Sequence, residues 1–202
     1  MDMLASLLPA GIAVHAPALI VVIPLIMAAV AAFMPKGLWA WGVTLVTAIA
    51  VAVLSLNILG QVSTGGVISY AMGGWLPPAG IELRVDMLNV PLLLLVGIVG
   101  LLCVIYALPS VADEIAKKQQ ALFYSAFLVC FAGLLGVTIT GDAFNVFVFL
   151  EISSISTYTI IAMGAGKDRR ALTASYNYLV LGTIGATFFV IGVGFLYMAT
   201  GT

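Results

Sequence analysis

Charged side chains are scarce in this sequence: Asp, Glu, Lys and Arg together make up 7% of its 202 residues. Soluble domains carry roughly a quarter of their residues as charged side chains, so a chain this poor in charge could not cover its own surface in water. Hydrophobic residues reach 63%. The composition therefore predicts an integral membrane protein, and the net charge of −1 gives no reason to expect nucleic acid as a partner.

Side chains that bind metals or cofactors are equally few. The two cysteines, Cys103 and Cys130, lie in different apolar runs without CxxC spacing, and His15 is the single histidine. The sequence contains no phosphate-binding glycine loop and no convincing Ser/His/Asp arrangement. We therefore expect no metal site and no bound cofactor in this chain, and we interpret the cysteines as small apolar packing residues.

Apolar runs of about 20 residues, the length needed to cross a bilayer, occur repeatedly along the chain. They are continuously apolar rather than alternating, which favours helices over a β-barrel. The sequence thus predicts an all-α polytopic membrane protein in which residues 1–202 form a single transmembrane domain. The six predicted spans are about 16–34, 38–59, 88–108, 121–140, 143–163 and 171–199.

The basic residues are unevenly distributed among the connections between these spans. The connections after the first, third and fifth spans hold six of the seven Lys and Arg residues, and only Arg84 lies on the other side. Short loops rich in Lys and Arg remain in the cytoplasm. The pattern predicts a multi-pass protein of the cell (inner) membrane with its N-terminus outside. The six residues are Lys36, Lys117, Lys118, Lys167, Arg169 and Arg170.

The connection between the second and third predicted spans has a different pattern. From Ile81 to Asp86, apolar and charged residues alternate, which is the period of a strand. A second short run, Val67–Met72, precedes it, and glycines and prolines between the two are typical of turns. We expect a short external β-hairpin that ties neighbouring elements together, with an irregular polar loop as the alternative.

One carboxylate lies in the middle of a predicted span. Glu151 interrupts the run "FNVFVFLEISSISTYTIIAM", within about two residues of the centre of span 143–163. Inserting a charged acid at that depth costs at least roughly 2–3 kcal/mol, and a glutamate side chain is too short to reach either interface. The residue therefore needs a partner, a proton or both. The simpler alternative is a protonated glutamic acid that only hydrogen-bonds a neighbouring helix.

A helical projection of this span places two hydroxyl groups on the face of Glu151. Ser154 and Tyr158 follow it toward the predicted cytoplasmic side, whereas Phe144 and Phe147 precede it toward the outer side. Hydroxyls on one side of the acid and aromatic rings on the other predict a hydrated proton path from the cytoplasm that ends at Glu151. A carboxyl group in such a place can gain and lose a proton near neutral pH.

Three further polar residues lie near the ends of the last two spans. Tyr176 is either part of the proton entrance or an ordinary interfacial residue. Asp142 and Asp168 precede helical runs, where a carboxylate is expected to cap the helix N-terminus.

The residues around Glu151 resemble a known family. "GDAFNVFVFLEISSISTYTIIAMG", followed by "RRALTASYNYLVLGTIGATFFVIGVGFLYMATGT", is similar to the antiporter-like subunits of Mrp-type multisubunit cation/proton antiporters, and most of all to their D-type member. The earlier stretch "GGWLPPAGIELRVDMLN" is similar to the segment ahead of that family's third span. These subunits are related to the proton-pumping membrane-arm subunits of respiratory complex I.

The resemblance implies a subunit of a monovalent cation/proton antiporter complex, a transporter rather than an enzyme. Glu151 matches the glutamate on which ion translocation depends in that family, so protons would cross through it in exchange for a cation, with sodium expected. The implied partners are these ions, the lipid bilayer and other hydrophobic subunits of the complex. Family members pair the glutamate with a lysine in the seventh span and continue through further spans, so the chain resembles their N-terminal portion.

Two other functions remain open. The chain could be a proton-pumping membrane subunit of a complex I-like NADH dehydrogenase or a membrane-bound hydrogenase, with all redox cofactors in partner subunits. It could also be a structural membrane anchor without transport activity.

Overall fold

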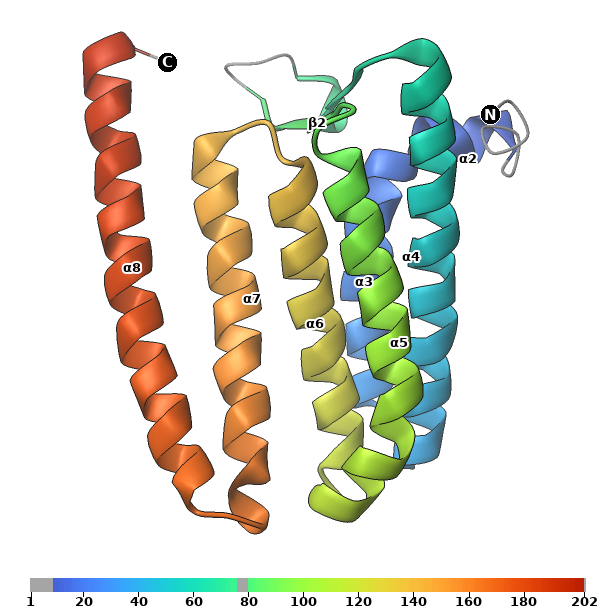
Figure 1. The fold of residues 1–202 in the computed structure, drawn as a ribbon, viewed down its shortest axis with the longest axis vertical. Helices are drawn as coiled ribbons and strands as arrows, with labels where there is room; N and C mark the ends of the chain where they lie inside the picture. Colours follow the sequence, from blue (N-terminus) through green and yellow to red (C-terminus); the bar gives the residue numbers. More distant parts are fainter. Residues whose placement is uncertain (1–8, 76–79, 202) are drawn as a thin grey trace.

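The computed structural model describes residues 9–75 and 80–201, and these form a bundle of apolar helices with a small β-hairpin at one end (Figure 1). Both ends of the described chain lie at the hairpin end of the bundle. The predicted all-α membrane architecture, with a hairpin between the second and third predicted spans, is confirmed. The helices are α2 (Ala10–Val14), α3 (Ala16–Ala32), α4 (Gly37–Gly65), α5 (Val90–Glu114), α6 (Gln120–Ile139), α7 (Ala143–Met163) and α8 (Arg170–Thr200).

Five of the described helices, α4 to α8, are long and apolar enough to cross a membrane. Helix α3 is apolar but has 17 residues, which corresponds to about 26 Å against a hydrocarbon core of about 30 Å. The helix ends two residues before the end of the predicted first span, residue 34. The helix stops at Ala32 because Pro35 disfavours helical backbone at the residue before it.

The other span boundaries differ from the predictions mainly at the ends. Helix α4 continues to Gly65, beyond the predicted residue 59, and stops where Gly66 adopts a positive φ of 82°. Helix α5 begins at Val90, with a proline in its first turn, and continues through Pro109 to Glu114. Helix α8 has 31 residues, or about 46 Å, so it exceeds the thickness of the hydrocarbon core without a break.

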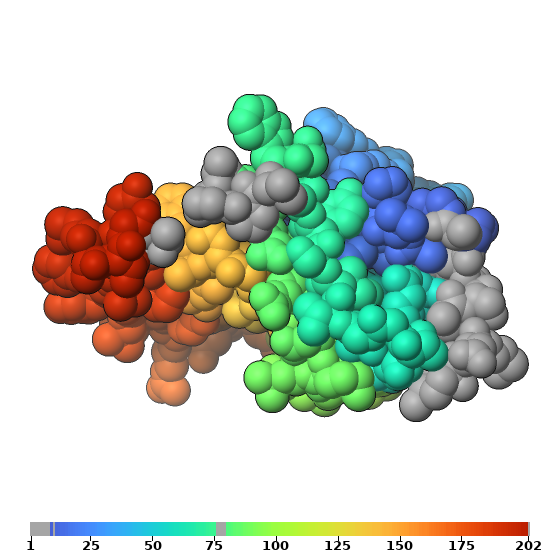
Figure 2. Space-filling model, turned by 90° about the horizontal axis from the view of Figure 1, so that it is seen from above, coloured from blue at the N-terminus to red at the C-terminus, as the bar shows by residue number. Residues whose placement is uncertain are grey.

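The bundle is arranged around α4, α5 and α6, with α7 and α8 added at one edge. Helix α3 packs against α4 and α6, α6 packs against α7, and α7 packs against α8. Seen from the hairpin end, α8 lies at the margin of the molecule with α7 beside it (Figure 2). None of the described residues of α8 is buried, so this helix is held to the rest of the chain mainly through α7.

The hairpin pairs β1 (Ile68–Ala71) with β2 (Glu82–Val85) in antiparallel register, Ile68 opposite Val85. Leu83 and Val85 are buried while Arg84 is exposed, as the alternating pattern predicts. The irregular-loop alternative is thereby excluded. The turn residues 76–79 lie outside the described part of the chain.

The hairpin also ties neighbouring elements together, as expected. Leu83 forms a β-bridge with Thr140, and the Gly141 amide donates to the Glu82 carbonyl at 2.9 Å. On the other strand, the Tyr70 hydroxyl lies 2.9 Å from His15 Nδ1. One small sheet thus joins the turn before α3 to the turn before α7.

Replacing the buried leucine of the hairpin is expected to destabilise the protein strongly. Leu83 is 3% exposed, so Leu83→Ala removes packed methyl groups and should cost about 2–5 kcal/mol of unfolding free energy. Ile81→Ala is the control, because Ile81 is 45% exposed and should change stability by no more than about 0.5 kcal/mol. Thermal unfolding in detergent measures both variants. Equal melting temperatures for the two would contradict the packing role of Leu83.

Candidate functional site

Helix α7 carries the candidate site and begins at a side-chain cap. Asp142 Oδ1 accepts a hydrogen bond from the Phe144 amide at 3.1 Å, and Asp142 Oδ2 accepts one from Asn145 Nδ2 at 2.9 Å. The capping role predicted for Asp142 is confirmed. Asp168 acts similarly ahead of α8, where its Oδ1 accepts from the Arg170 amide at 2.9 Å.

Small residues let α7 approach α6 closely. A Cβ atom built on Gly133 of α6 would lie 2.8 Å from the backbone nitrogen of Ser153 and 3.0 Å from the carbonyl oxygen of Phe149. Gly136, one turn away, faces the Phe149 ring. The position of α7 is therefore set by backbone contact with α6 over the stretch that surrounds Glu151.

The hydroxyl groups on the α6 side of α7 bond within their own helix. Ser153 donates to the Leu150 carbonyl at 2.9 Å, and Ser156 donates to the Ile152 carbonyl at 2.8 Å. Thr157 donates to the Ser153 carbonyl at 2.7 Å. This face carries polar atoms in an apolar bundle, but those hydroxyls already have acceptors and need no ligand.

Glu151 is the ninth of the 21 residues of α7 and is half-buried. At 3.6 residues per turn it lies roughly 160° around the helix from Ser153, on the side away from α6. Within residues 9–75 and 80–201, no group forms a hydrogen bond or an ion pair with the carboxyl group of Glu151. The alternative that the acid only hydrogen-bonds a neighbouring helix therefore lacks a partner in this part of the chain.

The residues predicted to form a proton path lie on α7 and α8. Ser154 and Tyr158 are half-buried, on the same broad side of α7 as Glu151, and Tyr176 of α8 is 65% exposed. Ser175 joins the two helices, because its hydroxyl donates to the Tyr158 carbonyl at 2.7 Å. The sequence predicts a place in the proton entrance for Tyr176 but not for its neighbour Ser175, because no spacing pattern in the sequence indicates a contact between Ser175 and Tyr158.

The aromatic residues at the start of α7 are partly open to the surroundings. Phe144 is 54% exposed, and its ring centroid lies 6.1 Å from that of Phe147. Both precede Glu151 toward the hairpin end, whereas Ser154 and Tyr158 follow it toward the opposite end. The acid thus lies between an aromatic segment and a segment with hydroxyl groups, on a face of α7 that α6 does not cover.

Comparison with known proteins bears on what this arrangement does. Residues 140–202 match the family described as "NADH:quinone oxidoreductase/Mrp antiporter, TM". Over 93% of the chain, 41% of residues are identical to the N-type subunit of the NADH-quinone oxidoreductase of Desulforudis audaxviator. Over 90% of the chain, 37% are identical to the D-type subunit of the Na(+)/H(+) antiporter of Bacillus subtilis. The chain spans 37% and 36% of those two proteins, little more than a third of each.

Two solved structures of membrane complexes also contain chains that are similar to this one. A chain of the archaeal membrane-bound sulfane sulfur reductase superposes on 92% of this chain with a TM-score of 0.81 and 31% identity. A chain of the Mrp complex from Dietzia sp. superposes on 94% of it, also with a TM-score of 0.81, at 26% identity. This chain covers 38% and 35% of those two chains. The resemblance seen in the sequence is confirmed: the chain is similar over most of its length to subunits of Na(+)/H(+) antiporters and NADH-quinone oxidoreductases.

Proposed function

We propose that this chain is part of an ion-translocating subunit of a membrane complex, and that Glu151 carries the protons. The observation that supports this most directly is a carboxyl group near the middle of an apolar helix, with no partner in the described chain. Such a group is costly in lipid and is normally kept for ion or proton transport. The relatives named as antiporter and oxidoreductase subunits support the same interpretation.

The geometry suggests how protons reach the acid. Ser154, Tyr158 and Tyr176 offer hydroxyl groups between Glu151 and the end of the bundle opposite the hairpin. In this proposal protons enter along these groups and are carried by the carboxyl group of Glu151. A cationic side chain brought near by another segment or subunit would favour the carboxylate and release the proton.

In the leading version of this proposal the complex exchanges protons for a monovalent cation, with sodium expected. The Bacillus subtilis relative is named as part of a sodium/proton antiporter. In the second version a redox reaction in partner subunits drives proton pumping. Two observations favour it: the 41% identity to an NADH-quinone oxidoreductase subunit and the structural likeness to a sulfane sulfur reductase complex.

Reconstitution separates these versions from a purely structural anchor. The assembled complex is placed in proteoliposomes that contain a pH-sensitive dye, and sodium or potassium is added outside. Cation-dependent proton movement without any reductant supports antiport. Proton movement that needs a reductant and an electron acceptor supports pumping. If neither condition moves protons while the complex remains intact, the transport proposal is wrong.

The proposed orientation can be tested separately. Figure 1 shows the α3–α4, α5–α6 and α7–α8 connections at the end opposite the hairpin. These connections and the first residue of α8 hold six of the seven Lys and Arg residues. That end is expected to face the cytoplasm. In a cysteine-free background, single cysteines at Lys117 and Arg169 should react only with reagent that reaches the cytoplasm. A cysteine at Gly65 should react from outside, and the reverse labelling would overturn the orientation.

A further inference from the structure

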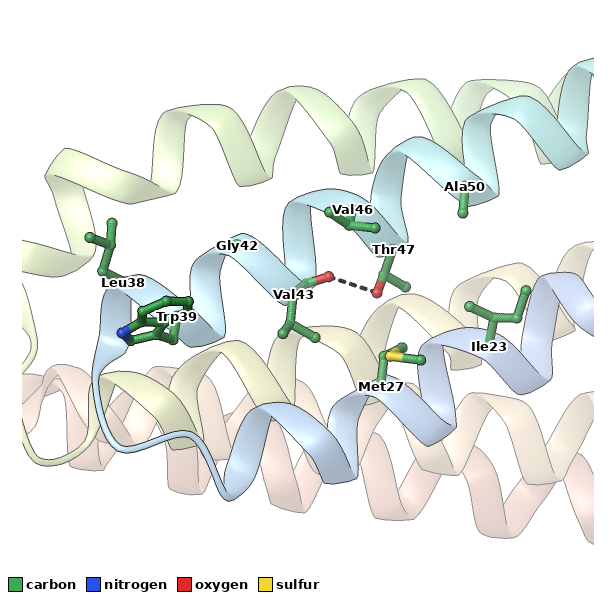
Figure 3. Close-up of a pocket in the computed structure, with 9 residues that line it drawn as sticks. All are labelled: Ile23, Met27, Leu38, Trp39, Gly42, Val43, Val46, Thr47 and Ala50. Atoms are coloured by element: carbon green, nitrogen blue, oxygen red, sulfur yellow. Dashed lines mark hydrogen bonds between the residues drawn. The ribbon is translucent and has the colours of Figure 1, made fainter.

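An apolar groove of about 590 Å³ runs between α3 and α4, outside the candidate proton site (Figure 3). Ile23 and Met27 of α3 form one wall, and seven residues of α4 between Leu38 and Ala50 form the other. Gly42 has no side chain and nothing lies within 4 Å of where its Cβ would be, so this part of the groove is open. Pockets of roughly 300–1,000 Å³ are typical of small-molecule sites.

The groove presents hydrocarbon almost exclusively. Its one hydroxyl, on Thr47, donates to the Val43 carbonyl at 2.8 Å, the bond drawn in Figure 3, so the hydroxyl is not free to recognise a polar ligand. Trp39 lies at the end nearest the α3–α4 connection and is 63% exposed. An indole ring at the end of an apolar surface is typical of the boundary between lipid tails and headgroups.

The length of the groove matches one leaflet. From Leu38 to Ala50 the axis of α4 rises about 18 Å, whereas half of a hydrocarbon core is about 15 Å. A transmembrane helix of another subunit would need a contact surface along the whole bilayer. A groove that begins beside the interface and ends near the middle of the membrane instead fits a single acyl chain.

A positive charge lies at the open end. Lys36 precedes the first residue of α4 and is exposed, and it is three residues from Trp39. It is also the single charged residue between positions 9 and 66 of the sequence, so no carboxylate of α3, α4 or their connection can neutralise it. A lysine at the membrane surface attracts anionic headgroups.

We propose that this groove binds an anionic phospholipid of the surrounding membrane. One acyl chain lies along Gly42, Val46 and Ala50, and the phosphate group is held at Lys36 beside Trp39. The site is independent of Glu151, which lies on α7.

The test uses the assembled complex and two photoactivatable lipids that carry the same diazirine-labelled acyl chain, a phosphatidylglycerol and a phosphatidylcholine. After illumination, peptides are mapped by mass spectrometry. Phosphatidylglycerol is expected to label the α3 and α4 peptides that contain Met27 and Val46. One lysine at the surface favours the anionic lipid by about fivefold, so phosphatidylcholine should label the same peptides correspondingly less.

Two variants and a control decide the outcome. Lys36→Gln should reduce phosphatidylglycerol labelling to the phosphatidylcholine level, and Gly42→Leu, which fills the groove, should reduce labelling by both lipids. Val53→Leu, on α4 but outside the groove, should change neither. Melting temperatures confirm that each variant is folded. Equal labelling by both lipids in the wild type, unchanged labelling in Gly42→Leu, or cross-linking of the groove to another protein helix would overturn the proposal.

Discussion

Glu151→Gln is expected to reduce proton movement by the assembled complex by about a hundredfold or more, the lower range of what a positioned proton-transfer group contributes. Glutamine keeps the shape of the side chain and its hydrogen-bonding capacity, but it cannot bind and release the proton. The carboxyl group of Glu151 has no hydrogen bond or ion pair among the described residues, so the substitution breaks no such bond there. Assembly and melting temperature should therefore remain close to those of the wild type.

Two further variants separate proton transfer from a loss of charge or of structure. Glu151→Asp keeps the carboxyl group one methylene shorter and should retain part of the activity. Asp142→Asn removes a carboxylate from the same helix, but asparagine caps a helix about as well as aspartate, so activity should be nearly unchanged. Transport by Glu151→Gln at the wild-type rate would falsify the role of Glu151. An equal loss in Asp142→Asn would point to a general effect of charge on α7 instead.

The elements of the fold could be predicted from the sequence because each has a strong local signal. Long apolar runs can cross a bilayer only as helices, and alternation from Ile81 to Asp86 indicated the strand that the structure shows as β2. Helix ends were harder to predict. They depend on single residues such as Pro35 and Gly66, whose effect on the backbone an apolar run does not reveal.

The candidate site could be predicted only in part, for a related reason. Helical periodicity shows that Glu151, Ser154 and Tyr158 share a side of α7, but it does not reveal which neighbour faces that side. The structure adds that α6 packs on the opposite side, through Ser153. The hydrogen bond from Ser175 to the Tyr158 carbonyl joins residues 17 positions apart. Such a contact depends on how α7 and α8 pack, which the sequence of neither helix specifies.

The packing of α7 on α6 leads to the second large effect: Gly133→Leu is expected to leave little or no folded protein. A Cβ at Gly133 alone would lie 2.8 Å from the backbone nitrogen of Ser153, closer than real Cβ contacts, and leucine adds three more carbons. A backbone atom cannot rotate out of the way as a side chain can, so α7 must move as a unit. Overpacking by a few methylenes already costs about 1–3 kcal/mol, and whole domains are stable by only about 5–15 kcal/mol.

The matched control is Gly42→Leu, which makes the same substitution where nothing lies within 4 Å of the new Cβ. Both variants gain the roughly 1 kcal/mol by which a better helix former exceeds glycine, so the comparison isolates the contact with α7.

Gly133→Ala should be intermediate, with a lowered melting temperature. Because α7 carries Glu151, any Gly133→Ala protein that assembles should also move protons more slowly. Size-exclusion profiles and melting temperatures in detergent provide the measurement. Recovery of Gly133→Leu in the same yield and with the same melting temperature as Gly42→Leu would show that α7 is not held by this contact.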